Sequence, residues 1–154
     1  AQELYENGIA LSFEETGAGS ADAYIANSTA KPAAFVDNTS NGGNAAAPSA
    51  VTIAWDAAAD FETSLEKIMT QKWIALYPNG CEGWAEYRRT GYPALLPVLN
   101  NDSEGAVNTD LQIRRVPYPH DEYSTNAAGV ASGVAKLGGS DNAGTKLWWD
   151  KKSR

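Results

Sequence analysis

The stretch that decides the fold is KWIALYPNGCEGWAEYRRTGYP, residues 72–93. It joins two runs of helical spacing across Pro78, Asn79 and Gly80, and proline and glycine interrupt helices. Asn79 followed three residues later by Glu82 has the spacing of a capping box, in which two side chains satisfy backbone N–H groups at a helix start. The stretch therefore predicts two helices folded back on each other as a hairpin.

The helix before this turn has the strongest helical pattern in the chain. Its apolar residues recur three and four positions apart over residues 60–77, as expected for one face of a helix: Phe61, Leu65, Ile68, Met69, Trp73 and Leu76. We expect these side chains, Phe61 apart, to be buried, with Trp84 packed back against them. Most of the hairpin's aromatic residues are thus predicted to be core and not ligand surface. The second helix is expected to end at about Thr90.

Upstream, the spacing of Tyr5, Ile9 and Phe13 predicts an amphipathic helix over residues 2–16 that ends at Gly17. A short helical run, 22–26, follows with Ser20 as its cap. Residues 28–51 are rich in Asn, Gly, Ser, Pro and Ala, which predicts a long surface loop. Loops of this length are functional or disordered, and both alternatives stay open.

Downstream of Pro93 the pattern becomes irregular. The segment LQIRRVPYP, residues 111–119, is expected to be extended, and His120 is expected in a proline-bounded turn. A final helix is predicted from Val130, Val134 and Leu137 behind Asn126, ending at Gly138. The chain opens on helical periodicity without a preceding cap, so we expect a piece of a longer protein.

Composition excludes several classes of protein. The 154 residues, 43% hydrophobic and 20% charged, suit one soluble globular domain. The net charge of −7, with no run of Lys or Arg, argues against nucleic acid as a partner. The single cysteine excludes an internal disulfide, and no apolar run approaches the ~20 residues needed to cross a bilayer.

The sequence offers little for catalysis. There is one histidine and no Gly-x-Ser-x-Gly nucleophile elbow. A pair of Cys81 with His120 stays open as an alternative, with Cys81 in the first turn of a predicted helix. The neighbouring carboxylates, such as Glu14–Glu15, are expected on solvated faces, since sequence neighbours do not make a glycosidase pair. We expect no enzyme activity and no cofactor.

Metal sites are also poorly supported. One cysteine and one histidine fall short of a four-ligand zinc site. The segment DNTSNGG begins like a calcium-binding EF-hand loop at Asp37, but Pro48 occupies the twelfth position, where a bidentate glutamate is needed. An irregular calcium site that uses Asp37 or Asp141 stays open.

Three blocks of sequence together resemble the C-terminal part of the SusD/RagB family of outer-membrane nutrient-binding lipoproteins. They are LEKIMTQKWIALYPNGCEGWAEYRRTGYP (65–93), IRRVPYPHDEYSTN (113–126) and LGGSDNAGTKLWWD (137–150). The blocks stand in the family's order and near the family's chain end. Residues 60–150 resemble the family closely, and the opening helix and the Asn-rich loop resemble it more loosely.

The resemblance implies a mainly α fold: a helical hairpin of a tetratricopeptide-like scaffold that carries long irregular loops. Residues 1–154 would form the C-terminal segment of such a protein. Within it we expect a helical part (1–27), a surface loop (28–55), the helical hairpin (56–93) and a loop-rich C-terminal region (94–154). The family's lipidated cysteine has no counterpart here, because Cys81 lies within a predicted helix.

The resemblance also implies a function. Members bind glycans, or sometimes peptides, at the cell surface, deliver them to a SusC-type TonB-dependent outer-membrane transporter, and are not enzymes. The expected partners are a glycan or oligosaccharide, that transporter and the remainder of the same polypeptide. A lipid anchor is expected in the preceding N-terminal region. The alternative is a scaffold segment that docks the transporter without touching ligand.

We assign candidate ligand contacts by elimination. The hairpin aromatics are expected in the core, and Trp148 and Trp149 are expected to seal the C-terminal segment, with sugar stacking as the alternative for this pair. That leaves the Asn-rich loop, which offers an aromatic ring, an acceptor carboxylate and amides that both donate and accept. The candidate ligand-binding residues are Phe35, Asp37, Asn38, Asn41, Asn44 and Trp55.

Overall fold

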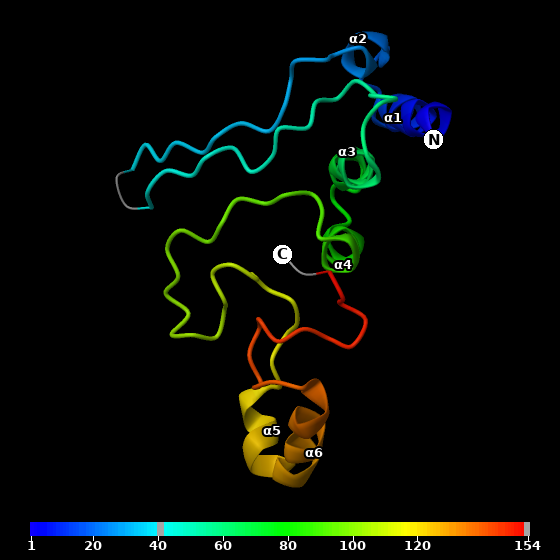
Figure 1. The fold of residues 1–154 in the computed structure, drawn as a ribbon. Coiled ribbons are helices and arrows are strands. Elements are labelled where there is room, and N and C mark those ends of the chain that lie inside the picture. Colours follow the sequence, from blue (N-terminus) through cyan, green and yellow to red (C-terminus); the bar gives the residue numbers. More distant parts are fainter. Residues whose placement is uncertain (40–41, 153–154) are drawn as a thin grey trace. The chain divides into compact units, whose positions relative to one another are not determined.

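The computed structural model of the chain describes residues 1–39 and 42–152. Within them it contains six helices joined by long irregular segments (Figure 1). These elements belong to two compact units: Ala1–Val36 with Ala45–Leu96, and Asp37–Asn44 with Pro97–Arg154. The predicted mainly α class is therefore confirmed. None of the helices in the described ranges has the length and apolar character required to cross a membrane.

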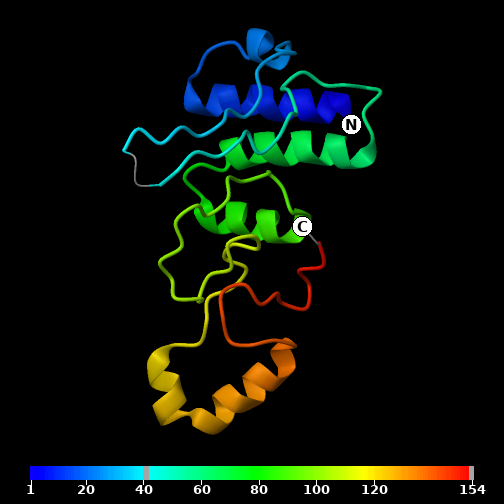
Figure 2. The same ribbon diagram turned by 60° about the vertical axis from the view of Figure 1, so that its left-hand side comes forward.

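The first unit is a stack of helices. It holds α1 (Gln2–Thr16), α2 (Asp22–Ile25), α3 (Phe61–Ala75) and α4 (Gly80–Thr90). Helix α3 contacts both α1 and α4 and lies between them (Figures 1 and 2). The hairpin predicted from residues 72–93 is the α3–α4 pair, and the stacking of successive helices is the architecture of helical repeats.

The predicted helix ends follow local chemistry. Gly17 and Gly91 adopt positive φ values of 68° and 78° and close α1 and α4, a conformation that glycine adopts without steric cost. The Asn79 side chain accepts a hydrogen bond from the Glu82 backbone N–H at 3.3 Å, as predicted. Glu82 does not complete the capping box: the Asn79 N–H donates to Leu76, and the Glu82 carboxylate lies 3.4 Å from Lys72.

The core of the first unit lies between α1 and the segment that follows the loop. Tyr5, Ile9 and Ala21 are buried, and five half-buried side chains pack against them: Phe13, Tyr24, Ile25, Trp55 and Ile68. The Tyr5 and Trp55 rings are 5.2 Å apart, and the Tyr5 hydroxyl donates to the Ile53 carbonyl at 2.6 Å. Burial is the largest of the causes that raise the pKa of Tyr5 to about 12.

The predicted burial of the α3 face is only partly correct. Met69 is buried and Leu65, Ile68 and Leu76 are half-buried. Trp73, predicted to face inward, is 38% exposed, so that prediction is wrong. Gly83 of α4 lies against the six-membered ring of this indole, and a glycine covers less of a ring than a larger side chain would. Trp84 is half-buried, with the Arg88 guanidinium 3.6 Å from its ring centroid.

The second unit holds α5 (His120–Thr125) and α6 (Ala127–Leu137), which contact each other. Helix α6 ends at Gly138, with φ of 73°, as predicted. His120 was expected in a turn but begins α5, directly after Pro119. The segment 111–119 was expected to be extended. Among the described residues it makes only an isolated bridge, between Asn108 and Gln112, because Gln112 turns the chain with φ of 57°.

Two buried ion pairs organise the second unit. Arg114 donates from Nε and Nη2 to the two carboxylate oxygens of Asp150, at 2.7 and 2.6 Å, and these side chains are 5% and 1% exposed. Arg115 pairs with Asp141. The pairs join the IRRVPYPHDEYSTN block to the LGGSDNAGTKLWWD block, which gives a physical reason for the two blocks to occur together.

The same contacts correct the expectation for the C-terminal tryptophans. Trp149 is half-buried, but Trp148 is 82% exposed and does not seal the segment. The carboxylate of Asp150 anchors this part of the chain through Arg114 instead.

Candidate functional site

Residues 28–39 and 42–55, which belong to the predicted surface loop, contain no helix, and the two arms of this segment run side by side (Figure 1). The arms meet at a bridge in which Phe35 and Ala45 exchange two backbone hydrogen bonds of 3.0 Å. Beyond this bridge lies the loop tip, residues 37–44, part of which belongs to the described residues. The bridge fixes where the tip begins and ends.

Asp37 organises the loop tip. One carboxylate oxygen accepts from the Thr39 N–H at 2.7 Å and the Thr39 hydroxyl at 2.6 Å. The other accepts from the N–H groups of Gly42 and Gly43. The Asp37 N–H in turn donates to the Asn44 side chain at 3.0 Å. Asp37 is therefore engaged within the loop, and its acceptor oxygens shape the backbone.

These donors stabilise the ionised carboxylate. The Thr39 hydroxyl makes the largest contribution, followed by backbone N–H groups, and the pKa of Asp37 falls from 3.8 to about 2. Because the folded pKa lies below the unfolded one, the unfolded loop binds more protons between these values. The resulting stabilisation is present above pH 3.8 and is lost as the pH falls through about 2.

This predicts an acid-sensitive loop tip. Between pH 4 and pH 2, cleavage of the protein by pepsin in residues 35–44, followed by mass spectrometry, is expected to accelerate as Asp37 is protonated. Asp37→Asn is the matched control, because its side chain cannot ionise and its loop cleavage should change less over this range. Equal acceleration in both proteins would contradict the prediction.

The six candidate ligand-binding residues differ in their exposure to solvent and in their position in the structure. Phe35 is 44% exposed, and Asn38 and Asn44 are exposed. Trp55 is half-buried and packs on Tyr5, and Asn41 lies outside the described residues. Asp37 and Asn44 are hydrogen-bonded to each other, whereas Phe35 and Trp55 belong to the first unit. Ligand contact by these residues stays a prediction.

Lys67 holds the returning arm of the loop and was missed in the sequence. Its side chain is buried in the middle of α3, with the residue 4% exposed. The ammonium donates to the Thr52 carbonyl at 2.6 Å, the Thr52 hydroxyl at 3.1 Å and the Ala54 carbonyl at 2.8 Å. Burial lowers the pKa of Lys67, and Asp56 partly offsets this. Lysine is a common residue in helices, so the sequence alone does not indicate that this lysine is buried and binds the loop.

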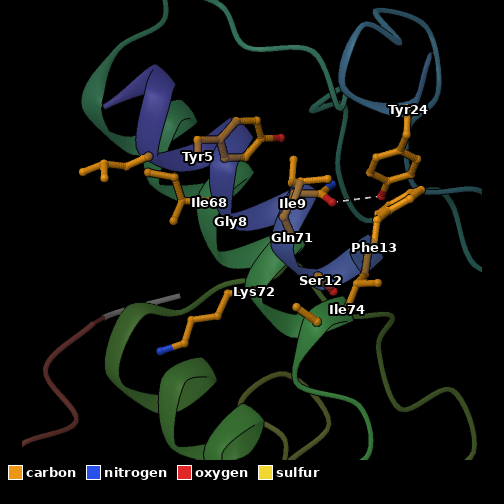
Figure 3. A pocket seen from close by; sticks show the side chains of 12 residues that line it. Tyr5, Gly8, Ile9, Ser12, Phe13, Tyr24, Ile68, Gln71, Lys72 and Ile74 are labelled. Atoms are coloured by element: carbon orange, nitrogen blue, oxygen red, sulfur yellow. Dashed lines mark hydrogen bonds between the residues drawn. The ribbon is translucent and has the colours of Figure 1, made fainter. Parts of the chain in front are cut away.

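An apolar hollow of about 240 Å³ lies between α1, α2 and α3. Figure 3 shows its lining side chains from close by, with the Tyr24 hydroxyl donating to the Gln71 amide oxygen at 2.9 Å. Its apolar lining includes Ile9, Phe13, Ile68 and Ile74. An apolar hollow with few polar groups suits packing of another apolar side chain better than binding of a sugar.

A second hollow, of about 520 Å³, lies at the turn between α3 and α4, and we call it the turn hollow. It is lined by Trp73, Ile74, Leu76, Tyr77, Pro78, Asn79, Gly80 and Gly83. Its aromatic side chains, Trp73 and Tyr77, are 38% and 89% exposed.

A third hollow, in the second unit, has a volume of about 450 Å³ and a polar lining that includes Asn108, Thr109, Asn142 and Thr145. The side-chain oxygens of Asn108 and Asn142 already accept backbone N–H groups that follow them in the chain. These amides therefore shape their own turns. None of the three hollows described is lined by any of the six candidate residues.

The carboxylates considered for calcium are engaged by protein donors. Asp141 accepts from Arg115, from the Tyr118 N–H at 3.0 Å and from the Tyr123 hydroxyl at 2.6 Å. Burial would raise the pKa of Asp141, but these donors outweigh it and lower the pKa. In the described parts of the chain no group of three or more His, Cys, Asp or Glu residues could hold a metal ion.

Comparisons with known proteins fit this architecture. The model of the family described as "SusD-like: Susd and RagB outer membrane lipoprotein" matches residues 1–150. A chitin-binding SusD homologue from Flavobacterium johnsoniae is 52% identical, with a TM-score of 0.88 over 99% of this chain and 32% of its own. No protein of curated function matches the chain.

Two further SusD homologues have the same fold over the same length. The one from Bacteroides ovatus is 46% identical, with a TM-score of 0.87 over 99% of this chain and 33% of its own. The one from Bacteroides uniformis is 44% identical, with a TM-score of 0.89 over 99% of this chain and 32% of its own. The chain thus spans about a third of the length of these solved structures. It belongs to the SusD-like family of SusD and RagB outer-membrane lipoproteins.

Proposed function

We propose that the protein containing this chain binds a glycan at the cell surface, and that the glycan is a chitin-type oligosaccharide of N-acetylglucosamine. The observation that carries this proposal is the 52% identity, over 99% of the chain, to a SusD homologue described as chitin-binding. The chain has the same fold as that homologue throughout this segment, with a TM-score of 0.88.

The Asn-rich loop supplies groups suited to a sugar. Phe35, one of the two residues of the bridge that closes the loop, is 44% exposed, and an aromatic face suits the apolar face of a pyranose. Asn38, Asn41 and Asn44 would donate to and accept from sugar hydroxyls. Asp37 and Trp55 were predicted to contact the ligand, but in this proposal they support the loop instead. Asp37 shapes the loop tip, and Trp55 packs in the core at the base of the loop.

The test of the loop uses two neighbouring residues. Titration of the full-length protein with N-acetylglucosamine hexamer is expected to show roughly tenfold weaker binding for Phe35→Ala. A stacked aromatic ring contributes about 0.5–1.5 kcal/mol beyond its buried area, and a loss of about 1.4 kcal/mol corresponds to tenfold weaker binding. Val36→Ala is the matched control, since Val36 is 62% exposed and outside the bridge. Unchanged affinity in Phe35→Ala would exclude the loop as the contact.

Membership of the family also supports a proposal for where the bound glycan goes next. In this proposal the protein sits at the outer membrane through a lipid anchor and hands its ligand to a SusC-type TonB-dependent transporter. The transporter is the finer part of the proposal and would be tested by co-purification of the full-length protein from membranes. Recovery without any TonB-dependent transporter would contradict it.

A scaffold role is the second candidate, and exposed apolar side chains favour it. Leu4 and Ile74, which are 79% and 55% exposed, line the hollow shown in Figure 3, and Leu11 of α1 is 64% exposed. Exposed apolar surface of this kind marks interaction sites. The remainder of the polypeptide or the transporter would cover it, and the chain would then contribute no ligand contact.

We predict that the protein binds chitin without cleaving it. The sequence holds a single histidine, His120, and no Gly-x-Ser-x-Gly nucleophile elbow. Incubation of purified protein with chitin oligosaccharides should release no new reducing ends. Release that disappears when one acidic residue is replaced would overturn this prediction.

A further inference from the structure

We infer that the turn hollow between α3 and α4 is a second glycan contact, in which Trp73 and Tyr77 stack on an N-acetylhexosamine unit and Asn79 binds its acetamido group. The inference rests on the proposed function and adds a site to it. Of these two aromatic residues, Trp73 was predicted to lie in the core.

The indole of Trp73 is exposed but held in place. Gly83 of α4 lies against its six-membered ring, where a Cβ would meet two ring carbons at 3.5 Å. The residue nevertheless keeps 38% of its surface in contact with solvent. A ring supported by α4 and open to solvent loses little freedom when a ligand stacks on it, and this favours binding.

Tyr77 adds a second ring to the same hollow. It follows the end of α3 and is 89% exposed, so its ring contributes almost nothing to the core. Large exposed aromatic side chains are enriched at binding sites because they offer contact area at a low entropy cost.

Three polar groups at the turn hollow are available to a ligand. Among the described residues, the Trp73 indole N–H, the Tyr77 hydroxyl and the Asn79 amide NH₂ have no hydrogen-bond partner. All three can donate. Asn79 caps α4 with its oxygen, which leaves its NH₂ as the donor. The carbonyl of an acetamido group is an acceptor, and its methyl group suits the surface of Ile74 and Pro78.

Size and lining separate this hollow from the other two. At about 520 Å³ the turn hollow lies within the ~300–1,000 Å³ typical of ligand pockets. The α1–α3 hollow is smaller, at about 240 Å³, and its ring of Tyr5 is buried. The polar hollow of the second unit has no aromatic side chain in its lining. Stacking on two exposed rings is therefore specific to the turn hollow among these three.

The first experiment maps contact directly. Hydroxyl-radical oxidation of the full-length protein, read by mass spectrometry, is compared with and without N-acetylglucosamine hexamer. We expect Trp73 and Tyr77 to become protected. Phe61 is the control, since it lies at the opposite end of α3 and is 75% exposed.

The second experiment measures affinity. Tyr77→Ala is expected to weaken binding of the hexamer roughly tenfold with an unchanged melting temperature, because Tyr77 is exposed. Asn79→Ser keeps a capping oxygen and removes the NH₂ donor, so it should weaken the hexamer more than it weakens cellohexaose, which lacks acetamido groups. Phe61→Ala should bind as the unmodified protein does.

The outcomes separate the two levels of the proposal. Binding by the unmodified protein, with no protection of Trp73 or Tyr77 and no loss in Tyr77→Ala, overturns this inference and leaves the proposed function intact. Absence of binding by the unmodified protein overturns the proposed function, and the inference with it. Protection together with the loss in Tyr77→Ala supports both.

Discussion

Replacing Arg114 by alanine is expected to destabilise the second unit by about 3–5 kcal/mol, the cost of breaking a buried ion pair by removing one partner. Arg114 makes two charge-assisted hydrogen bonds to Asp150, at 2.7 and 2.6 Å. Removal of the guanidinium would leave the Asp150 carboxylate, 1% exposed, without its cation. The penalty comes mainly from that uncompensated buried charge.

Native-state hydrogen exchange measures this effect in the full-length protein. The reporters are the amides of Arg114 and Ala143, which donate to the Ala143 and Ala106 carbonyls at 2.7 and 2.8 Å. Their protection should fall in Arg114→Ala, while amides of α1 in the first unit keep theirs. A global loss of protection that includes α1 would contradict a local role.

Two further variants distinguish the contribution of the buried charge from that of side-chain packing at Arg114. Arg114→Lys keeps the charge but loses the two-pronged geometry, so its cost should be smaller than that of alanine. The double variant Arg114→Met, Asp150→Leu removes both charges and should lie close to the unmodified protein. If the double variant is as unstable as Arg114→Ala, the buried carboxylate is not the cause.

The sequence predicted those parts of the fold that depend on nearby residues. Gly17, Asn79, Gly91 and Gly138 each act within one turn of chain, so helix ends could be predicted without a structure. Helix α5 was missed, although Asp121 and Glu122 after Pro119 were a usable signal, since acidic residues in a first turn favour the helix dipole.

Other features depend on contacts between distant residues. Periodicity placed Trp73 on the inner face of α3, but its exposure depends on the glycine that α4 brings to it. Arg114 and Asp150 are 36 positions apart, and no spacing rule connects them. In the candidate site, composition identified the loop, whereas the hydrogen bonds of Asp37 depend on where the folded backbone places the N–H groups of Thr39 and Gly42.

The two candidate glycan contacts rest on different kinds of support. The loop residues are supported by their chemistry, and Phe35 is 44% exposed while its backbone belongs to the bridge with Ala45. The turn hollow is supported by geometry: two aromatic rings line it, together with the side-chain donors of Trp73, Tyr77 and Asn79, which have no hydrogen-bond partner among the described residues. Both depend on the rigidity of the first unit, and the buried Lys67 supplies part of that rigidity.

Lys67→Met is accordingly expected to destabilise the returning arm of the loop by about 2–4 kcal/mol. Methionine has a similar length and fills the space, but it cannot donate. The carbonyls of Thr52 and Ala54, now bonded at 2.6 and 2.8 Å, would lose their donor, and each unsatisfied buried acceptor costs about 1–3 kcal/mol. Relief of the buried charge offsets part of this loss.

The hydrogen exchange of the Ala54 amide reports this change, because it donates to the Asn27 carbonyl at 2.8 Å across the base of the loop. Its protection should fall in Lys67→Met. Lys72→Met is the control on the same helix, since Lys72 bonds Glu82 and Glu86 of α4 and not the loop. Glycan binding through Phe35 should weaken with loss of the Lys67 anchor. Full affinity in a protein whose loop base has lost protection would show that the arm does not position the ring.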